Sequence, residues 1–321
     1  MTLHDVVDAL NAHQRFLVTT HQNPDGDAVG SLLAMAHLLR AELDKYVVAV
    51  LPDPVAKRYR FLPGLNTLVL PRIAGKQGPF DALVTLDVSS PTRIGGVNDL
   101  IKPGMTRINI DHHVTNPRSD DVCWVNTEAS ATSEMVVDIY RELGAIPTPD
   151  VATALYTGIL TDTGQFAFPS TTAKTLHAAA ELVEQGAAHE QVALETYRKT
   201  EAKNVRALGQ VISRMQLFDD DSFAISWVSH DELDVDHEGF VNTMLDIDTV
   251  EIAALIRPLD SGQWKLSMRS AGMVDVAELA KNVAGGGHPL AAGGTLKAAD
   301  INSALASVTE MCLKALTSAR G

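Results

Sequence analysis

Residues 21–31 read "HQNPDGDAVGS" and place His21, Asp25 and Asp27 within seven residues of one another. The segment before them, "RFLVTT", is typical of a β-strand, and the segment after them, "SLLAMAHLLRAEL", is typical of a helix. The three side chains are therefore expected on a strand-to-helix turn, which in parallel α/β sheets belongs to the edge where ligands bind. For this stretch alone, a polar loop with an aspartate helix cap is an equal alternative.

Three other segments of the first half carry acidic or imidazole groups where a predicted element ends. Asp87 follows the apolar run in "ALVTLDVSS", Asp162 follows a helical pattern in "GILTDTGQF", and "RINIDHHVTN" contains Asp111, His112 and His113. Taken singly, each group could be a turn former, a capping residue or part of a polar loop. The carboxyl ends of parallel strands share one edge, so these distant residues can converge. Such a cluster of carboxylates is costly unless cations neutralise it.

Divalent metal ions would supply that neutralisation. A site rich in oxygen with a few imidazoles suits Mn²⁺ better than structural zinc, which prefers Cys and His ligands. Four of these carboxylates and two of these imidazoles fit two metals roughly 3.5–4 Å apart, with one carboxylate bridging them. A hydroxide that bridges the two metals would attack a phosphoryl group. His21 and Asp25 would then hold one metal and Asp27 the other, because the turn at Pro24 and Gly26 aims them apart.

The elements that must position these residues predict an α/β fold with two domains. Apolar runs in the first half are continuous rather than alternating, which indicates a parallel sheet covered by helices on both faces. Residues 189–215 are charged and helical in pattern, so we expect a helical connector between a domain at 1–188 and a smaller α+β domain at 216–321. In "QWKLSMRS" of the second domain, apolar and polar residues alternate, as in a half-buried strand.

Composition excludes several classes of protein. The chain has 321 residues and a net charge of −14, so a broad surface for duplex nucleic acid is not expected. Its two cysteines, Cys123 and Cys312, lie far apart, which argues against disulfides or a thiolate metal site and for a reduced compartment. The sequence shows neither a signal peptide nor an apolar stretch that could cross a bilayer. These features predict a soluble cytoplasmic protein without a membrane partner.

The order and spacing of these segments resemble a known family. "HQNPDGDAVGS", "LDVSS", "NIDHHVTN" and "GILTDTGQF" look like the four motifs of the DHH phosphoesterase superfamily. In the second half, "GGGHPLAAGG" looks like the glycine-rich signature of the DHH-associated C-terminal domain. Together these motifs span nearly the whole chain. Its length resembles that of the compact NrnA-like members, which are nano-RNases that also remove the 3′-phosphate of 3′-phosphoadenosine 5′-phosphate.

The resemblance implies a role for each matching residue. It implies two Mn²⁺ ions, with Mg²⁺ or Co²⁺ as substitutes, held by His21, Asp25 and Asp87 at the first site and by Asp27, Asp87, His112 and Asp162 at the second. Asp87 would bridge the two ions. His113 would face the scissile phosphate, and Asp111 would orient the neighbouring imidazoles.

A phosphate cradle is expected in the second domain. A run of glycines lets backbone N–H groups approach an anion closely, and a neighbouring histidine and arginine can add charge-assisted bonds. The residues in question are Gly285, Gly286, Gly287, His288 and Arg269. A flexible loop is the alternative for the glycines. Arg93, shortly after Asp87, is a further candidate for phosphate contact, with an exposed loop arginine as its alternative.

The family places this cradle opposite the metals across an interdomain cleft, which favours short substrates held by a terminal phosphate. We therefore expect a Mn-dependent phosphoesterase that hydrolyses short single-stranded oligoribonucleotides, including pApA, to mononucleotides and acts on nucleoside bisphosphates. A phosphodiesterase for cyclic dinucleotides such as c-di-AMP uses the same motifs and stays an alternative. A manganese pyrophosphatase and a non-catalytic nucleotide sensor are further alternatives. Family members are often dimers, which implies a homodimer.

Overall fold

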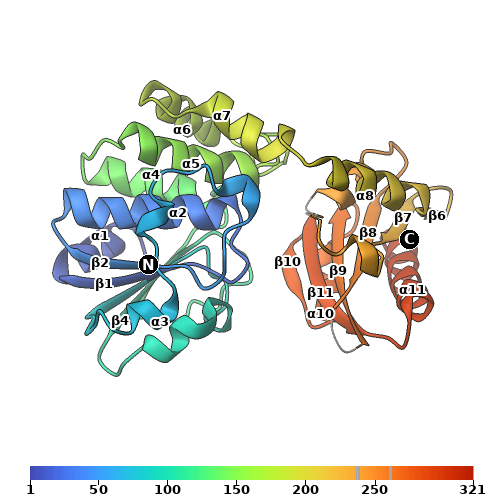
Figure 1. Ribbon diagram of the computed structural model, residues 1–321, viewed down its shortest axis with the longest axis horizontal. Coiled ribbons are helices and arrows are strands. Elements are labelled where there is room, and N and C mark those ends of the chain that lie inside the picture. The colour runs from blue at the N-terminus through green and yellow to red at the C-terminus, as the bar shows by residue number, and fades with distance from the viewer. Residues whose placement is uncertain (236, 238, 260–261, 321) are drawn as a thin grey trace. The chain divides into compact units, whose positions relative to one another are not determined.

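The computed structural model describes residues 1–235, 237, 239–259 and 262–320. The chain forms two compact units, Met1–Lys199 and Thr200–Gly321. Each unit has its own sheet and its own apolar core, and each is described by itself (Figure 1).

The first unit is built on a five-stranded sheet in the order β2-β1-β3-β4-β5. Every neighbouring pair in it is parallel. Strand β1 therefore lies beside β3, and β3 beside β4, so their carboxyl ends are adjacent. The strands are β1 (Arg15–Thr19), β2 (Tyr46–Val50), β3 (Ala82–Leu86), β4 (Thr106–Asp111) and β5 (Val122–Val125).

Helices cover both faces of this sheet, which explains its continuous apolar strands. Phe16 and Val18 of β1 pack into the core beneath α1, α2 and α4, whereas Leu17 packs into the core on the opposite face, beneath α3 and η4 (Figure 1). The helical elements of this unit are α1 (Leu3–Ala12), α2 (Gly26–His37), η1 (Leu38–Glu42), η2 (Lys57–Tyr59), η3 (Leu65–Thr67), α3 (Pro71–Ala74), η4 (Pro91–Leu100), α4 (Thr132–Glu142), α5 (Pro149–Asp162), α6 (Ala173–Glu184), α7 (His189–Ala193) and η5 (Leu194–Arg198).

Helices α2 and α5 pack unusually close together, and glycines make this possible. A Cβ atom at Gly30 of α2 would lie 2.3 Å from the backbone oxygen of Ala154 in α5. A Cβ atom at Gly158 of α5 would lie 2.7 Å from a carboxylate oxygen of Asp27 and 2.0 Å from Oγ of Ser133. This close packing holds Asp27, in the first turn of α2, against α5 and the start of α4.

The second unit is built on a six-stranded mixed sheet in the order β10-β11-β9-β8-β7-β6. One face packs against α10 and α11 and the other against α8 and α9, with Ile225 and Ala224 of β7 facing opposite cores. The elements are α8 (Ala202–Ser213), β6 (Gln216–Phe218), β7 (Phe223–Trp227), η6 (His230–Glu232), α9 (Phe240–Leu245), β8 (Ile252–Pro258), β9 (Gln263–Ser270), α10 (Val276–Lys281), β10 (Gly286–His288), β11 (Ala291–Lys297) and α11 (Ile301–Arg320).

These observations confirm the expected α/β class, with a parallel sheet in the first unit and a separate mixed sheet in the second. Within residues 189–215 the chain is helical except at 199–201 and near the C-terminal end of the stretch, and the division into two units falls between Lys199 and Thr200. The glycine-rich stretch considered as a loop instead contributes β10 and β11, paired antiparallel. In the described part of the chain, no helix is both long and apolar enough to span a membrane.

Candidate metal centre

The site residues of the first unit lie where its elements end. His21 follows β1, Asp87 follows β3, and His112 directly follows β4. Asp162 is the last residue of α5. Since β1, β3 and β4 are neighbours in a parallel sheet, their ends meet at one edge.

Asp25 and Asp27 are placed by the start of α2. Asp25 is the N-cap of this helix, and its side chain accepts the backbone N–H of Ala28 at 3.0 Å. The aspartate cap weighed as an alternative is therefore present, yet the same carboxylate also lies 3.8 Å from Nε2 of His21. Asp27, two residues on, is fully buried.

Asp87 lies at the centre of the cluster. Its Oδ2 is 3.3 Å from Nε2 of His21, and its Oδ1 is 3.5 Å from Nε2 of His112. The Oδ1 atom also lies 3.4 Å from Nδ1 of His113 and accepts the hydroxyl of Thr132 at 3.3 Å. A single carboxylate thus faces three imidazoles.

In the described part of the chain, Asp87 belongs to three groups of potential ligand atoms, one of them with Asp111 and His113. Ligand atoms of His21, Asp25 and Asp87 all lie within 4.8 Å of one another, and so do those of Asp27, Asp87 and His112. Asp162 lies beside the second group, with Oδ2 3.1 Å from Nε2 of His112. This geometry offers two neighbouring positions for cations with a common carboxylate.

The imidazoles are oriented as metal ligands usually are. Nδ1 of His21 lies 2.8 Å from the carbonyl oxygen of Gln22, and Nδ1 of His112 lies 3.2 Å from that of Ala129. If these nitrogens carry the proton, they donate to the carbonyls, and each Nε2 turns its lone pair toward the carboxylates. A backbone carbonyl on the far nitrogen is the common partner of metal-ligating histidines. The donor set therefore fits divalent cations.

Electrostatics in the cluster also favour added positive charge. Burial raises the pKa of Asp27 to about 7, and the nearby charge of Asp87 acts in the same direction. Burial likewise raises the pKa of Asp162 well above its ordinary value, against the effect of His112. Burial alone would lower the pKa of His21, but the hydrogen bond with Asp87 and the charge of Asp25 outweigh it and raise this pKa to about 9. Without metals, the cluster therefore gathers protons.

The amino end of α4 contributes to the site and was not among the residues expected from the sequence. Backbone N–H groups of Thr132 and Ser133 donate to Asp27 at 2.6 and 2.8 Å. Amides at the start of a helix favour an anion there, so they stabilise the buried carboxylate. The signal in the sequence is only "ATSE" ahead of an amphipathic helix, which reads as an ordinary helix start.

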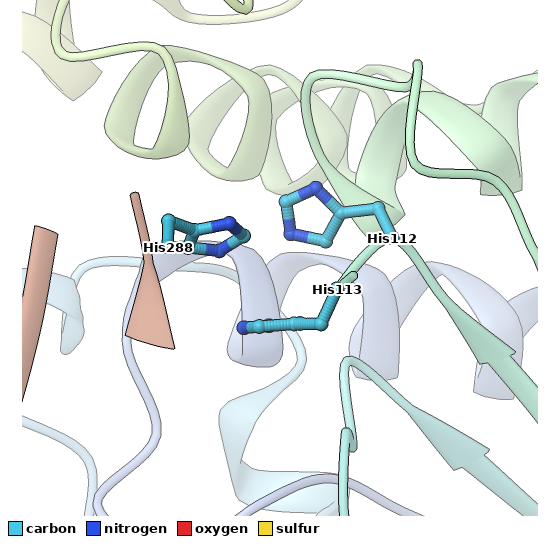
Figure 2. A group of neighbouring side chains, drawn as sticks. All are labelled: His112, His113 and His288. Carbon is cyan, nitrogen blue, oxygen red and sulfur yellow. The ribbon is translucent and has the colours of Figure 1, made fainter. Parts of the chain in front are cut away.

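Asp111 and His113 form a further pair at the end of β4, beside Asp87. Nδ1 of His113 lies 2.8 Å from Oδ1 of Asp111, which is fully buried. Figure 2 shows the rings of His112 and His113 next to each other, with centroids 4.9 Å apart and planes at 70°. The third ring drawn there, His288, belongs to the second unit. Arg93 lies in η4, and its carbonyl oxygen accepts the backbone N–H of Gln22 at 2.7 Å.

In the second unit, the sheet register places Arg269 and His288 on the same face. Ala291 of β11 lies opposite Arg269 of β9 on one side and opposite His288 of β10 on the other. Residues in one such row point the same way, so both side chains flank the small Ala291. This row of the sheet therefore holds two side chains that can carry positive charge, separated by an alanine.

Packing of the backbone accounts for two of the three glycines. A Cβ atom at Gly285 would lie 2.1 Å from the carbonyl oxygen of Gly293, and one at Gly287 would lie 2.5 Å from that of Ala291. Gly287 also has φ of +147°, which side chains rarely allow. Gly286, in contrast, faces open space and can take a ligand close to its backbone.

Comparison with known proteins identifies the family. Residues 15–159 match the DHH family, N-terminal domain, and residues 220–314 match the DHHA1 domain. Because a curated relative is also similar over 94% of the chain, the chain belongs to the DHH family.

Its relatives of known description include two bacterial proteins named bifunctional oligoribonuclease and PAP phosphatase NrnA. The protein of Thermus thermophilus is 35% identical over 303 residues, which cover 94% of this chain and 90% of the relative. The protein of Bacillus subtilis is 27% identical over 320 residues, which cover 96% of this chain and 98% of the relative. Among solved structures, an exopolyphosphatase-related protein from Bacteroides fragilis superposes with a TM-score of 0.90 at 27% identity, covering 99% of this chain and 98% of the other.

Proposed function

We propose that this protein is a phosphoester hydrolase that cleaves short oligoribonucleotides to mononucleotides and removes the 3′-phosphate of 3′-phosphoadenosine 5′-phosphate. The observation that carries the proposal is the position of Asp87, whose carboxylate lies both in the ligand group with His21 and Asp25 and in that with Asp27 and His112. The names of the relatives from Thermus thermophilus and Bacillus subtilis support the same two activities.

Two divalent cations at these positions would activate a water molecule and neutralise charge on the phosphoryl group under attack. His21, Asp25 and Asp87 would hold the first ion, and Asp27, Asp87, His112 and Asp162 the second. Mn²⁺ suits this set because it accepts both imidazole and carboxylate ligands. His113 would contact the scissile phosphate through Nε2, since its Nδ1 is engaged by Asp111.

Arg269, His288 and Gly286 would bind the terminal phosphate of the substrate. Their face of the sheet combines two side chains that can carry positive charge with a glycine whose Cβ position has nothing within 4 Å, so a ligand can approach the backbone there. A phosphate held there selects substrates with a free end. The net charge of −14 supports the preference for short oligomers, because a long strand needs a basic track to follow.

The test is hydrolysis by the purified protein with Mn²⁺ of 5′-phosphorylated oligoribonucleotides of increasing length, alongside the bisphosphate and c-di-AMP. We expect turnover of the dinucleotide and of the bisphosphate, a decline with length, and little cleavage of c-di-AMP. Asp87→Ala, prepared in parallel, reports contaminating nucleases. Preferred cleavage of c-di-AMP would instead identify a cyclic-dinucleotide phosphodiesterase, and binding without turnover of any substrate a nucleotide sensor.

Metal dependence is tested in the same assay. We expect turnover to vanish in excess chelator and to return best with Mn²⁺ and less well with Mg²⁺, because imidazoles are poorer ligands for Mg²⁺. Undiminished turnover in chelator would rule out the two-metal proposal. Metal content of the active protein, measured by mass spectrometry, should approach two ions per chain.

A further inference from the structure

The carboxylate of Asp111 is held from two sides. Its Oδ1 accepts the backbone N–H groups of His112 and His113 at 2.9 and 3.3 Å, and it faces Nδ1 of His113 at 2.8 Å. Its Oδ2 accepts Nδ2 of Asn116 at 2.6 Å. One oxygen therefore orients His113, while the other is held by an amide five residues further along the chain.

The orientation of the Asn116 amide follows from its neighbours. Its Nδ2 lies within hydrogen-bond distance of three acceptors, namely Oδ2 of Asp111, Oδ1 of Asn109 at 2.8 Å and the carbonyl oxygen of Val88 at 3.2 Å. Its Oδ1 accepts the backbone N–H of Arg118 at 2.8 Å, which closes the turn. The amide nitrogen of Asn116 thus donates to Asp111, and its oxygen accepts the hydrogen bond that closes the turn. A flipped amide would bring its oxygen against three acceptors.

The network is anchored in the sheet behind the site. Asn109 of β4 is buried, and its Nδ2 donates to Oγ1 of Thr85 in β3 at 2.9 Å and to the carbonyl oxygen of Val88 at 3.1 Å. A line of hydrogen bonds therefore runs from β3 through Asn109, Asn116 and Asp111 to His113. Buried networks in which each member has its partners are rigid and fix side-chain orientation.

We propose that Asn116 is a positioning residue for phosphoester hydrolysis, acting through Asp111 on His113; this inference rests on the proposed function. At 2.6 Å, the bond to Oδ2 of Asp111 is the shortest of the three contacts of the Asn116 Nδ2 atom. Without it, only Oδ1 of the carboxylate is held, by the backbone N–H groups of His112 and His113 and the ring of His113, and Oδ2 can move about this oxygen. His113 then loses the fixed direction of its Nε2 toward the substrate, and small misplacements of a reacting group cost up to about 10²-fold in rate.

The substitution Asn116→Ser tests the hydrogen bond made by Nδ2 separately from the one accepted by Oδ1. A serine hydroxyl can still accept the N–H two residues on and so keep the turn, but it is too short to replace the bond to Asp111. We expect turnover of pApA to fall about 10- to 100-fold, KM to stay within about threefold, and the metal content to match the wild type. The protein should stay folded with a lower melting temperature, because Oδ2 of the buried Asp111 loses its donor. Asn126→Ala is the control, because the Asn126 side chain accepts the N–H of Glu128, two residues on, and its hydrogen bond to the Asp111 carbonyl oxygen is made by the backbone N–H, which alanine keeps. It should retain wild-type turnover.

A double-mutant cycle tests the route through His113. In a His113→Ala background, Asn116→Ser should reduce turnover no further than about twofold, because its effect is already lost. Losses that multiply in the double variant, or wild-type turnover in Asn116→Ser, would overturn the proposal. So would a loss of bound metal or of folded protein in Asn116→Ser, which would show a structural role only. Wild-type turnover in the same assay tests the proposed function by itself.

Discussion

Asp87 combines three features that ordinary turn residues do not share. Its backbone φ is +59°, in the left-handed region that residues other than glycine seldom adopt. Its carboxylate is buried and faces imidazoles from β1 and from the end of β4. Burial alone would raise its pKa, but hydrogen bonds with His112 and His21 hold this pKa well below the ordinary value. The strained backbone places a charged oxygen toward each of the two ligand groups.

Removal of this shared carboxylate should affect both metals. We expect Asp87→Ala to lose both ions and Asp25→Ala chiefly the first, because Asp25 belongs to one ligand group only. Loss of the metal-activated nucleophile removes several kcal/mol of transition-state stabilisation, so turnover in Asp87→Ala should fall by at least ~10³. Titration of metal-free protein with Mn²⁺, followed calorimetrically, counts the sites. Two filled sites in Asp87→Ala would show that it is not the bridge.

The basic residues of the second unit should act on the substrate alone. We expect Arg269→Ala and His288→Ala each to lower kcat/KM for pApA roughly 10- to 100-fold, since a charge-assisted bond contributes about 1.5–3 kcal/mol. Both variants should keep two metal ions. Lys265→Ala is a suitable control, because Lys265 lies on the same strand and the same face as Arg269, four residues away. Wild-type kcat/KM in both Arg269→Ala and His288→Ala would leave this face without a role in substrate binding.

At the scale of elements, the sequence revealed the strands that are long and apolar. The runs containing Leu17, Val84 and Ile108 were readable because both faces of the sheet are covered, so no polar residue interrupts them. Strand β5 was missed because it has only four residues, and β10 because glycine is rare in strands. The order of the strands is a property of tertiary packing, and no local pattern shows it.

The site likewise has residues that local sequence patterns predict and contacts that depend on tertiary packing. The meeting of His21, Asp87 and His112 follows from strand ends in a parallel sheet, which a sequence can show. The amides of α4 that hold Asp27 depend on how α4 packs beside α2, and the bond from Asn116 to Asp111 depends on the path of a loop. Contacts of this kind leave no periodic signal in the sequence.

The close packing of α2 and α5 leads to a prediction about Gly158. The added methyl group of Gly158→Ala would overlap Ser133 and the carboxylate of Asp27. Overpacking of this kind destabilises proteins by about 1–3 kcal/mol, so we expect a lower free energy of unfolding of the first unit and weaker binding at the second metal position. Chemical denaturation and Mn²⁺ titration measure the two effects.

Gly209 provides the matched control for this substitution. It also lies within a helix, α8, but nothing is within 4 Å of the position a Cβ atom would take. Gly209→Ala should therefore stabilise the second unit by up to about 1 kcal/mol, since alanine favours the helix. Equal stability and equal metal binding in Gly158→Ala and the wild type would contradict the proposed role of close helix packing.

At the scale of the whole molecule, the charge balance and the site act in the same direction. The chain carries a net charge of −14 and concentrates buried carboxylates at one sheet edge. In the metal-free protein this edge binds protons more tightly, because burial raises the pKa of Asp27, and the hydrogen bond with Asp87 and the charge of Asp25, against burial, raise that of His21. Folding without metal is thereby linked to proton binding, and folding with metal to proton release.

This linkage predicts how stability depends on pH. A group whose pKa is higher in the folded than in the unfolded protein stabilises the fold at low pH, and this contribution is lost as pH rises through the folded pKa. For Asp27 the loss extends from the ordinary value of 3.8 to about 7, and for His21 from 6.5 to about 9. We therefore expect the melting temperature of the first unit, measured in the whole protein with excess chelator, to fall steadily from about pH 6 to about pH 8.5.

Divalent cations should remove this dependence. They replace the protons at the carboxylate cluster, and they bind more tightly as pH rises because fewer protons compete. The increase in melting temperature on addition of Mg²⁺ or Mn²⁺ should thus be larger at the alkaline end of the range than at the acid end. His21→Asn and Asp27→Asn in chelator should flatten the pH dependence, since each removes one group with a raised pKa. If the melting temperature in excess chelator instead rises between about pH 6 and about pH 8.5, the cluster does not bind protons in place of metal.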